Sequence, residues 1–486
     1  MTYLGIDIGT SGVKAVLMDE KGKLLGDASA SLEVSRPKPG WSEQNPADWW
    51  SALLAAVDRL ASAHREEMSA LRGLGLSGQM HGATLLDKDN KVLRPAILWN
   101  DGRSFAECAE MEAAEPLLRE ISGNIAMPGF TAPKLLWVRK HEPDIFERTA
   151  KVLLPKDYVR FLLTGAFVSE MSDASGTLWL DVGKRDWSDA LLRATGLDRS
   201  HMPDLVEGSA ASGELNQDLR KRWGIAGPVV VAGGGGDNAA SACGIGAIRP
   251  GEGFVSLGTS GVLFVSNDRF RPNTAGAVHA FCHAIPETWH QMGVILSATD
   301  SLNWLSKVTG QDAAKLSNAA EAQFTGPGEE IFLPYLSGER TPYNNANARG
   351  SFVGLSHLSD PARLAQAVME GVTFAFRDCQ RVLGDAGTQI DHLLAVGGGS
   401  KSHLWLRMLA TNLNMPIALP HDGDYGGAFG AARLGLCAAE GAAPAAVMTR
   451  PAIQSVVEPD AALADAYAKQ YARYRALYEP IEEARS

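Results

Sequence analysis

The sequence predicts an α/β protein made of two duplicated domains with a cleft between them. Two glycine turns carry this prediction, because residues 9–13 and 258–262 both read Gly-Thr-Ser-Gly-Val with apolar residues on either side. We expect each segment to form a strand, a tight turn and a second strand. Recurrence of the motif within 486 residues indicates duplication. Since this length fits two or three domains, we expect domains over residues 1–245 and 246–486.

The two turns differ in their charged residues. The first has Asp7 before it and Lys14 after it, whereas the second has Ser256 and Leu263 at the equivalent positions. Backbone N–H groups of a glycine turn form an anion site, and a nearby carboxylate can hold hydrated Mg²⁺. The first turn therefore fits metal-bound phosphate, and the second fits phosphate alone. The alternative is two ordinary hairpins whose glycines only form turns, and it accounts less well for two copies that differ in this way.

The bulk composition excludes several classes of protein. A net charge of −11 argues against nucleic-acid or membrane-surface partners, because both are polyanions. The five cysteines form no CxxC pair, so neither a zinc site nor a redox motif is indicated, and scattered thiols suit a reducing cytosol. No apolar run reaches the roughly 18 residues of a membrane span. The chain begins with a strand rather than a signal peptide, and we expect a cytoplasmic protein.

Apolar spacing and capping residues predict the elements of the first half. Asn45 followed by Pro46 predicts a helix start, and apolar residues recur at helical spacing after it. An apolar strand over residues 71–77 runs into Met80 and His81, and polar residues at a strand end of an α/β fold lie where ligands bind. Further helices are expected over residues 104–121, 134–141 and 153–163.

A run of four glycines ends at Asp237. The β-branched residues before it predict a strand, and the alanines after it predict a closely packed helix. The glycines make a poor dinucleotide-binding motif, because its third glycine would fall on Asn238. The other interpretation is a carboxylate at a helix N-terminus, where the helix dipole would keep Asp237 ionised.

The second half repeats the alternation of strands and helices. A strand over residues 331–336 leads to Glu339 and Arg340, which we interpret as a hinge or an interdomain anchor. Asp101 and Arg103 could be a pair in the site or an internal ion pair, and we favour the ion pair, since such pairs commonly hold loops. Other expected elements are strands over residues 279–292 and 393–396 and helices over residues 298–308, 361–383 and 461–478.

The nucleotide-binding motifs belong to a particular superfamily. There is no GxxxxGK[ST] loop and no protein-kinase HRD and DFG set. The two glycine turns and the glycine triplet at residues 397–399 resemble the actin/hexokinase/heat-shock-seventy ATPase superfamily, with its two phosphate loops and its adenosine loop. Longer motifs narrow the resemblance to the FGGY carbohydrate kinase family over residues 3 to about 434; they include GQMHGATLLD, RPAILWNDGR, PGFTAPKLLW, SDASGTLWLDV and FLPYLSGERTP.

This resemblance implies both fold and activity. It implies two actin-like (ribonuclease H-like) domains, of which the N-terminal one binds sugar and magnesium-bound phosphate and the C-terminal one binds ATP. The implied reaction transfers the γ-phosphoryl group of ATP to a ketopentose, giving D-xylulose 5-phosphate from D-xylulose in xylose catabolism. ATP and Mg²⁺ are the implied cofactors. No nucleic-acid or membrane partner is expected, and a homodimer is compatible with the sequence.

The resemblance also implies roles for individual residues. Asp237 would be the general base, since a sugar hydroxyl is a weak nucleophile and a positioned carboxylate can take its proton. Met80 and His81 match the family's sugar-binding pair, and Asn238 can both donate and accept hydrogen bonds, which suits binding of a polyol. Asp7 would hold Mg²⁺ through water. His403 stands, by spacing, where many members place an Asn near adenine. The matched ATP-binding positions are Thr10, Ser11, Lys14, Gly258, Thr259, Gly398 and Gly399.

Two alternatives stay open at this point. One is an FGGY kinase for ribulose, gluconate or glycerol, with Met80 and His81 as the discriminating residues. The other is a non-catalytic actin-like ATPase, either a filament former or a chaperone, although no residues are left for a chaperone's peptide-binding domain. For a kinase we expect the cleft to close when sugar binds, because transfer requires water to be excluded.

Overall fold

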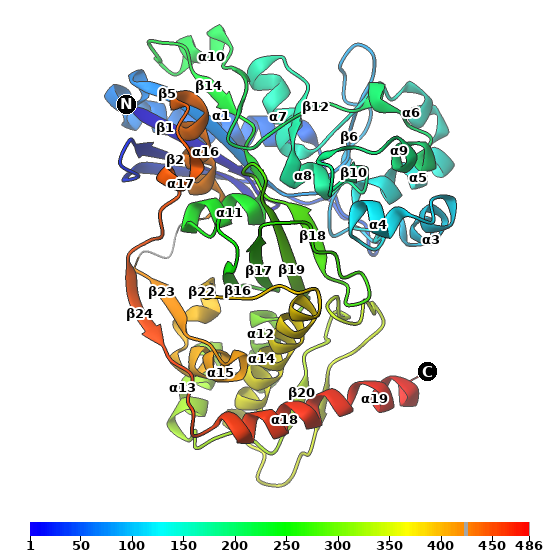
Figure 1. Ribbon diagram of the computed structural model, residues 1–486, viewed down its shortest axis with the longest axis vertical. Helices are drawn as coiled ribbons and strands as arrows, with labels where there is room; N and C mark the ends of the chain where they lie inside the picture. The colour runs from blue at the N-terminus through cyan, green and yellow to red at the C-terminus, as the bar shows by residue number, and fades with distance from the viewer. Residues whose placement is uncertain (422–425, 486) are drawn as a thin grey trace.

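The computed structural model describes residues 1–421 and 426–485. Two lobes are stacked along the long axis of the molecule, and each is built on a sheet with helices packed against it (Figure 1). One seven-stranded sheet comes from the first half of the chain and the other from the second half. Within the described ranges, no helix is both long and apolar enough to cross a membrane.

Each sheet combines a hairpin with parallel neighbours. The strands of the first sheet are β1 (Thr2–Ile8), β2 (Gly12–Asp19), β3 (Leu24–Ser31), β5 (Leu71–Gly78), β13 (Ala211–Glu214), β14 (Val230–Ala232) and β15 (Gly235–Gly236). Those of the second sheet are β16 (Glu252–Leu257), β17 (Gly261–Asn267), β18 (His279–Cys282), β19 (Trp289–Ile295), β22 (His392–Val396), β23 (Ile417–Pro420) and β24 (Ile453–Val457).

The two sheets repeat one pattern of strand directions. Along β3-β2-β1-β5-β14-β13, successive pairings are antiparallel, antiparallel, parallel, parallel and antiparallel. The series β19-β17-β16-β22-β23-β24 has the same pairings in the same order. The prediction of two duplicated α/β domains is therefore confirmed.

Each glycine turn joins two neighbouring antiparallel strands of its sheet, β1 and β2 in the first and β16 and β17 in the second. In the first turn, the Gly9 N–H donates to the Gly12 carbonyl at 3.0 Å. Ile6 and Ile8 before this turn are fully buried, and so are Leu257 and Leu263 around the second turn. Burial of these apolar side chains fixes the register of both hairpins, because a shift by one residue would expose them.

The helix predicted to start at Asn45 is confirmed as α1 (Pro46–Ala63). The Asn45 side chain caps it by accepting from the Ala47 N–H at 3.2 Å. Its apolar face, which includes Trp49 and Leu53, is fully buried in the core of the first lobe. The Asn-Pro start signal therefore agrees with the observed cap.

Two predicted elements were wrong in extent. The helix expected over residues 104–121 is divided into α3 (Phe105–Ala114) and α4 (Leu118–Ser122), because Pro116 lacks an N–H and its ring clashes with the preceding turn. The strand expected over residues 279–292 is an antiparallel pair, β18 and β19, with a turn between them. In that turn Glu287 adopts a positive φ of 49°.

One helix from late in the sequence belongs to the first lobe in space. Helix α16 (Gly427–Glu440) packs over β1 and β5 and against α11 (Asp237–Ile245). Glycines allow this approach, since a Cβ on Gly5 would lie 1.8 Å from the Ala428 carbonyl oxygen. A Cβ on Gly75 would lie 1.8 Å from that of Ala431. The chain therefore returns to the first sheet after completing the second, and the boundary at residue 245 stays a prediction.

The second lobe surrounds α14 (Pro361–Asp385), which packs against β19. Pro361 at its first position and the Asp360 side chain, which accepts from the Arg363 N–H at 2.9 Å, fix its start. Other helices of this lobe are α12 (Thr299–Thr309), α13 (Ala313–Ala322), α15 (His403–Leu413) and α18 (Ala464–Ala476). Those at the side of the first lobe include α5 (Thr131–His141), α7 (Pro155–Thr164) and α8 (Met171–Ser175).

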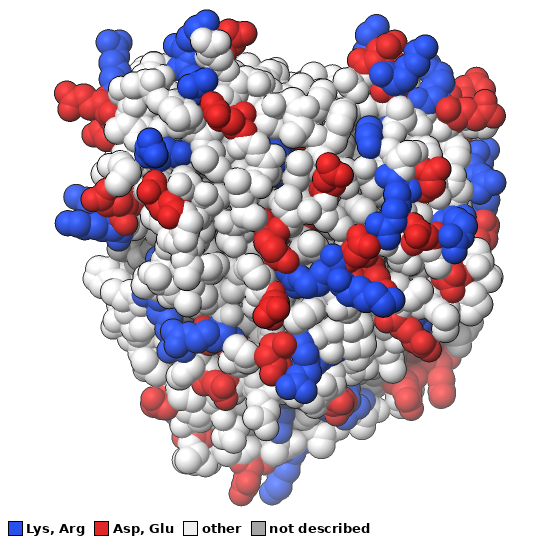
Figure 2. Space-filling view, turned by 45° about the horizontal axis from the view of Figure 1, so that its top comes forward, with Lys and Arg blue, Asp and Glu red and all other residues white. Residues whose placement is uncertain are grey.

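Charged side chains are mixed over the face seen in Figure 2. Lysine and arginine alternate with aspartate and glutamate there, and many of the two kinds lie next to each other. Ion pairs on the protein surface, such as Arg199 with Asp186 at 3.0 Å, join side chains of opposite charge. Exposed pairs of this kind add little to stability.

Candidate active site

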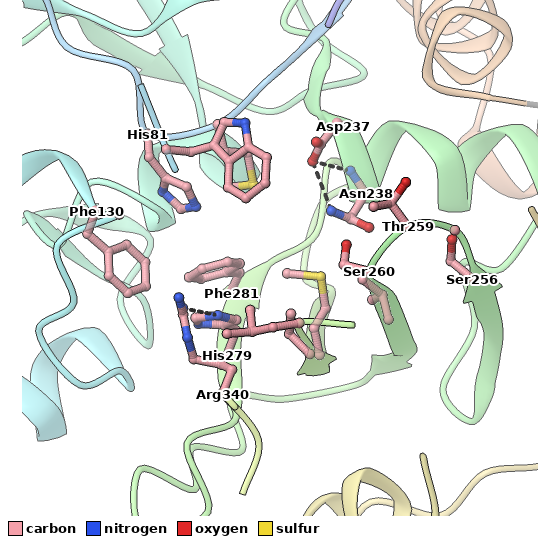
Figure 3. Close-up of a pocket in the computed structure, with 18 residues that line it drawn as sticks. His81, Phe130, Asp237, Asn238, Ser256, Thr259, Ser260, His279, Phe281 and Arg340 are labelled. Atoms are coloured by element: carbon pink, nitrogen blue, oxygen red, sulfur yellow. Dashed lines mark hydrogen bonds between the residues drawn. The ribbon is translucent and has the colours of Figure 1, made fainter. Parts of the chain in front are cut away.

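A cavity of about 520 Å³ lies where the two lobes meet. Figure 3 shows the labelled side chains that converge on it from both halves of the chain. Predicted residues and unpredicted aromatic residues both line its wall. The lining residues from the first lobe include Met80, His81, Trp99, Phe130, Asp237 and Asn238, and those from the second include Gly258, Thr259, Ser260, His279, Phe281 and Arg340.

Sheet topology explains why distant residues meet here. Strands β1, β5 and β15 run parallel and end at the same edge of the first sheet. In the register, Asp7 pairs with Ser77, and Gly236 pairs with Gly78. Asp7 near the end of β1 and Asp237 just after β15 therefore lie close together. Strand ends at such an edge are where α/β folds bind ligands.

The carboxylate of Asp237 is held by its neighbour. Its Oδ1 accepts from the Asn238 backbone N–H at 2.7 Å and from the Asn238 Nδ2 at 2.9 Å (Figure 3). The glycine run before it is needed for space, since Gly234 has a φ of 78° and a Cβ there would lie 2.1 Å from the Leu76 carbonyl oxygen. The glycines therefore form a tight passage from strand to helix.

A buried polar network supports the same loop from behind. The Gly236 N–H donates to the Ser172 Oγ at 3.0 Å, and that hydroxyl donates to the Glu170 carboxylate at 2.9 Å. The Arg160 guanidinium donates to the Gly233 carbonyl. These side chains are fully buried. These hydrogen bonds restrict the loop that carries Asp237.

Burial, and after it the negative charge of Asp7, raise the pKa of Asp237 to about 6. The hydrogen bonds from Asn238 oppose the shift. We expected the helix dipole to support the negative charge of Asp237; desolvation and a like charge nevertheless raise its pKa, but at neutral pH a group with a pKa of about 6 is still mostly ionised. A base with a pKa close to physiological pH is well suited to proton transfer.

This pKa predicts the acid limb of the activity profile. We expect kcat/KM for sugar to fall tenfold per pH unit below about pH 6, because a protonated Asp237 cannot accept a proton. Asn238→Ala removes a hydrogen bond that lowers the pKa of Asp237, so the limb should move to higher pH in that variant. Initial rates from about pH 5 to about pH 8 measure the acid limb of the unaltered enzyme and that of the Asn238→Ala variant. A limb that stays in place in the variant would exclude Asp237 as its source.

The imidazole of His81 is oriented as a hydrogen-bond acceptor toward the cavity. Its Nδ1 lies 2.6 Å from the Gly176 carbonyl oxygen, so Nδ1 must carry the proton. Burial lowers the pKa of His81 to about 3, so the ring stays neutral. The backbone is held in a positive-φ conformation, at 69°, and the Lys134 Nζ donates to the His81 carbonyl at 2.8 Å. The Nε2 is then free to accept from a hydroxyl.

The first glycine turn lies beside this cavity. The Trp99 Nε1, from the cavity wall, donates to the Thr10 Oγ1 at 2.9 Å, and that hydroxyl donates to the Gln79 Oε1 at 3.1 Å. Ser11 is exposed. The Thr10 hydroxyl is thus hydrogen-bonded within the protein. Donors for a phosphate at this turn would come from its backbone N–H groups and from Ser11.

The carboxylate of Asp7 stands opposite Lys14 across β1 and β2. Its Oδ1 accepts from the Ser77 Oγ at 2.8 Å. Burial raises the pKa of Asp7, while the Ser77 hydrogen bond and the positive charge of Lys14 oppose the shift. Helix α16 begins next to this group, since a Cβ on Gly427 would lie 3.1 Å from the Asp7 Oδ1.

The second glycine turn forms part of the cavity wall itself. Gly258 and Thr259 line the cavity, and their carbonyls bind the start of α12. The Thr299 N–H and Oγ1 donate to the Gly258 carbonyl at 2.9 and 2.8 Å. The turn therefore presents its other side to a ligand.

A second cavity of about 380 Å³ contains the predicted adenosine loop. Gly398 and Gly399 follow β22 and line this cavity together with residues of α12 and α13. Thr299 lines it too, so one residue joins the second turn to this cavity. His403 is not among the lining residues; its side chain is 71% exposed, and its Nδ1 lies 3.3 Å from the Glu321 Oε1.

Asp101 and Arg103 form the internal ion pair expected for them. The Arg103 Nε and Nη2 donate to the two Asp101 oxygens at 2.9 and 2.7 Å, and both side chains are 1% exposed. The Asp101 Oδ2 also accepts from the Ser42 N–H at 2.5 Å. Neither residue lines the cavity, so their role is structural.

Sequence reasoning missed several residues of the cavity wall. Phe130 and Phe281 contact the His81 ring, with centroids 4.9 and 6.4 Å away. Trp99 and His279 complete the aromatic wall. Phe130 and Trp99 occur inside quoted family motifs, so position within a motif was the available signal. No comparable signal marked His279 or Phe281.

A base with a raised pKa beside two anion-binding turns suits an enzyme that transfers a phosphoryl group to an alcohol. Aromatic side chains around polar groups in the same cavity suit a carbohydrate. The chain belongs to the FGGY family of carbohydrate kinases: the N-terminal domain of that family matches residues 2–244, and its C-terminal domain matches residues 253–439.

Individual relatives are similar to this protein along almost the whole chain. A xylulose kinase from Escherichia coli (strain K12) is 48% identical over 482 residues, covering 99% of both chains. A crystal structure titled as a "xyloylose kinase" from Brucella ovis has a TM-score of 0.98 at 57% identity and covers 100% of both chains. Xylulose kinase from Rhodospirillum rubrum has a TM-score of 0.92 at 28% identity and covers 99% of both chains. The expected actin-like fold and kinase activity are thereby confirmed.

Proposed function

We propose that this protein catalyses ATP-dependent phosphorylation of D-xylulose to D-xylulose 5-phosphate in xylose catabolism. The observation that carries the proposal is the end-to-end identity to xylulose kinases, together with Met80 and His81 in the wall of the cavity that holds Asp237. ATP is available in the cytoplasm, where we place the reaction.

Asp237 acts as the general base in the proposed mechanism. Its carboxylate takes the proton of the sugar O5 hydroxyl, and the O5 oxygen forms a bond to the γ-phosphorus of ATP. The bond between that phosphorus and the β,γ-bridging oxygen breaks, and ADP leaves with the bridging oxygen. Asn238 both donates and accepts hydrogen bonds and holds the Asp237 carboxylate. His81 accepts from a second hydroxyl through its Nε2, which orients the sugar.

The nucleotide spans both cavities in this proposal. Gly398 and Gly399 bind adenosine in the second cavity, which α12 and α13 complete. The phosphates extend past Thr299 toward Gly258 and Thr259 and toward the backbone of the first turn. Lys14 adds positive charge there, and Thr10 and Ser11 complete that turn. A site made largely of backbone donors suits phosphate oxygens.

The residues around Asp7 fit a magnesium ion. The Asp7 and Asp237 carboxylates are close enough for one charge to raise the pKa of the other, and a cation beside them would relieve this repulsion. The described residues contain no cluster of three or more metal-binding side chains. Mg²⁺ keeps several waters and takes phosphate oxygens as ligands. Asp7 would hold it through water, and the ion would neutralise charge on the β- and γ-phosphates.

A panel of acceptors tests the proposed substrate. With D-xylulose, D-ribulose, gluconate and glycerol compared in an ADP-release assay, we expect kcat/KM to be at least about 10-fold higher for D-xylulose, because misplaced hydroxyls leave buried polar groups unpaired. An incubation with ATP but no sugar is the control for transfer of the phosphoryl group to water. A preference for glycerol or gluconate would contradict the proposal, and equal ADP release without any sugar would favour a non-catalytic ATPase.

A further inference from the structure

Arg340 lies in the cavity wall, on the side away from Asp237 (Figure 3). The loop that carries it is tied to the end of β19. The Thr341 N–H donates to the Val294 carbonyl at 3.0 Å, and the Val294 N–H donates to the Thr341 Oγ1 at 3.0 Å. The Leu296 N–H donates to the Glu339 Oε1 at 3.0 Å. Because the backbone on both sides of Arg340 is fixed, its guanidinium is held at the cavity.

The partners of this guanidinium are unusual for a half-buried cation. Its Nη1 donates to the Met127 Sδ at 2.7 Å and lies 3.4 Å from the His279 Nε2. Burial holds the pKa of His279 well below its ordinary value, so this ring is a neutral acceptor. Among the described residues Arg340 has no ion-pair partner, whereas Arg103 and Arg185 in similar surroundings are paired with carboxylates.

The neighbouring carboxyl group of Glu339 does not neutralise the positive charge of Arg340. The Glu339 Oε1 accepts from the Leu296 and Arg340 backbone N–H groups instead of from the guanidinium. Burial raises the pKa of Glu339 to about 8, so most of it is uncharged at neutral pH. A guanidinium has five N–H donors, and those of Arg340 that face the cavity are available to the oxygen atoms of a ligand.

The direction of the sugar identifies those acceptors, if the proposed function holds. With O5 at Asp237, a five-carbon ketose directs its other end toward the opposite side of the cavity, where Arg340 lies (Figure 3). That end carries the O1 hydroxyl next to the C2 ketone. We propose that Arg340 is a substrate-binding residue that donates a hydrogen bond to O1 and thereby selects ketoses with a C1 hydroxyl.

This role predicts how the enzyme discriminates against a sugar that lacks O1. A buried donor left without its acceptor is costly, so 1-deoxy-D-xylulose should be a poorer substrate than D-xylulose for the unaltered enzyme. The same discrimination should disappear when Arg340 is replaced. The effect is therefore a coupling between one side chain and one substrate oxygen, which a purely structural role would not produce.

The experiment compares Arg340→Met with the unaltered enzyme on both sugars. Methionine retains an apolar contact to Met127 and removes the donors. We expect kcat/KM for D-xylulose to fall about 10- to 100-fold, mostly through KM, as for loss of a charged hydrogen bond. With 1-deoxy-D-xylulose the fall should be less than about 3-fold. Arg349→Met is the matched control, because Arg349 is exposed on the same loop and, within the described part of the chain, its hydrogen bonds go to backbone carbonyls. This variant should leave kcat/KM unchanged for both sugars.

Equal losses on both sugars would overturn the role of Arg340 while leaving the proposed function in place. Unaltered enzyme that phosphorylates neither sugar would instead reject the proposed function, and the role of Arg340 with it. If thermal unfolding shows that Arg340→Met does not fold, Arg340→Lys is measured by the same criterion. Lysine keeps a cationic donor group but loses the planar fork of the guanidinium. An intermediate preference for D-xylulose therefore supports the role, and an equal loss of kcat/KM on both sugars rejects it.

Discussion

Replacing Asp237 with Asn is expected to lower kcat by about 10²- to 10⁴-fold, the contribution typical of a general base. Asparagine has nearly the same shape and can still accept from Asn238, so the loop should keep its geometry. It cannot take a proton at the pH of the assay. Initial rates with saturating ATP and sugar measure the loss, and turnover within about 3-fold of the unaltered enzyme would remove Asp237 from this role.

The same substitution should raise stability at neutral pH. The pKa of Asp237 is higher in the folded protein, about 6, than its ordinary value of 3.8. Protonation of Asp237 therefore stabilises the fold fully below the lower value, and this contribution is lost as the pH rises through about 6. Asn at this position carries no charge, so Asp237→Asn should unfold at higher temperature than the unaltered protein at about pH 8 and should lose that advantage below about pH 4.

A matched control separates this effect from a general change in charge. Asp218 is 97% exposed, and Asp218→Asn should leave the melting temperature almost unchanged at both pH values. An Asp237→Asn protein that is less stable than the unaltered protein at about pH 8 would contradict the burial cost assigned to this carboxyl. Its inactivity would then be attributable to misfolding.

Replacing Gly430 with Ala is expected to destabilise the protein by about 3 kcal/mol or more, at the upper end of overpacking. Gly430 lies where α16 crosses α11, and a Cβ there would lie 1.7 Å from the Ala240 carbonyl oxygen. This obstacle is backbone, so one helix must move. Since α11 begins with Asp237 and α16 begins beside Asp7, movement would also change the spacing of the two carboxylates and lower kcat.

Gly384→Ala is the control for this prediction. Gly384 also lies in a helix, α14, but nothing comes within 4 Å of a Cβ placed there. Ala should therefore stabilise the protein by up to about 1 kcal/mol through its higher helix propensity. Chemical denaturation of both variants measures the contrast. If Gly430→Ala proved as stable as Gly384→Ala, the close crossing of α11 and α16 would be wrong.

Local signals in the sequence predicted much of the fold. The two glycine turns predicted the hairpins β1–β2 and β16–β17, and Asn45-Pro46 predicted the start of α1. These predictions were possible because caps and tight turns depend on neighbouring residues. The duplication could be inferred because both turns retain the same five residues. The break at Pro116 was predictable from the same chemistry, but apolar spacing on both sides suggested one continuous helix.

The rest depends on contacts between distant parts of the chain. Small residues in α16 indicate close packing, but not that the partner is the sheet of the first lobe. The raised pKa of Asp237 arises from burial and from Asp7, about half the chain away in sequence. Arg340 was interpreted as an interdomain anchor, and it does reach Met127 of the first lobe. Its place in the cavity wall becomes visible only once β19 and its loop are folded together.

The central claim is that Asp237 takes the proton from the sugar hydroxyl that is phosphorylated. A crystal structure with D-xylulose and a non-hydrolysable ATP analogue tests it most directly. We predict an Asp237 carboxylate oxygen within about 3.2 Å of the sugar O5. The γ-phosphate should lie on the opposite side of O5. A bound sugar whose O5 faces solvent or another side chain, with Asp237 out of hydrogen-bonding reach of every hydroxyl, would contradict the account.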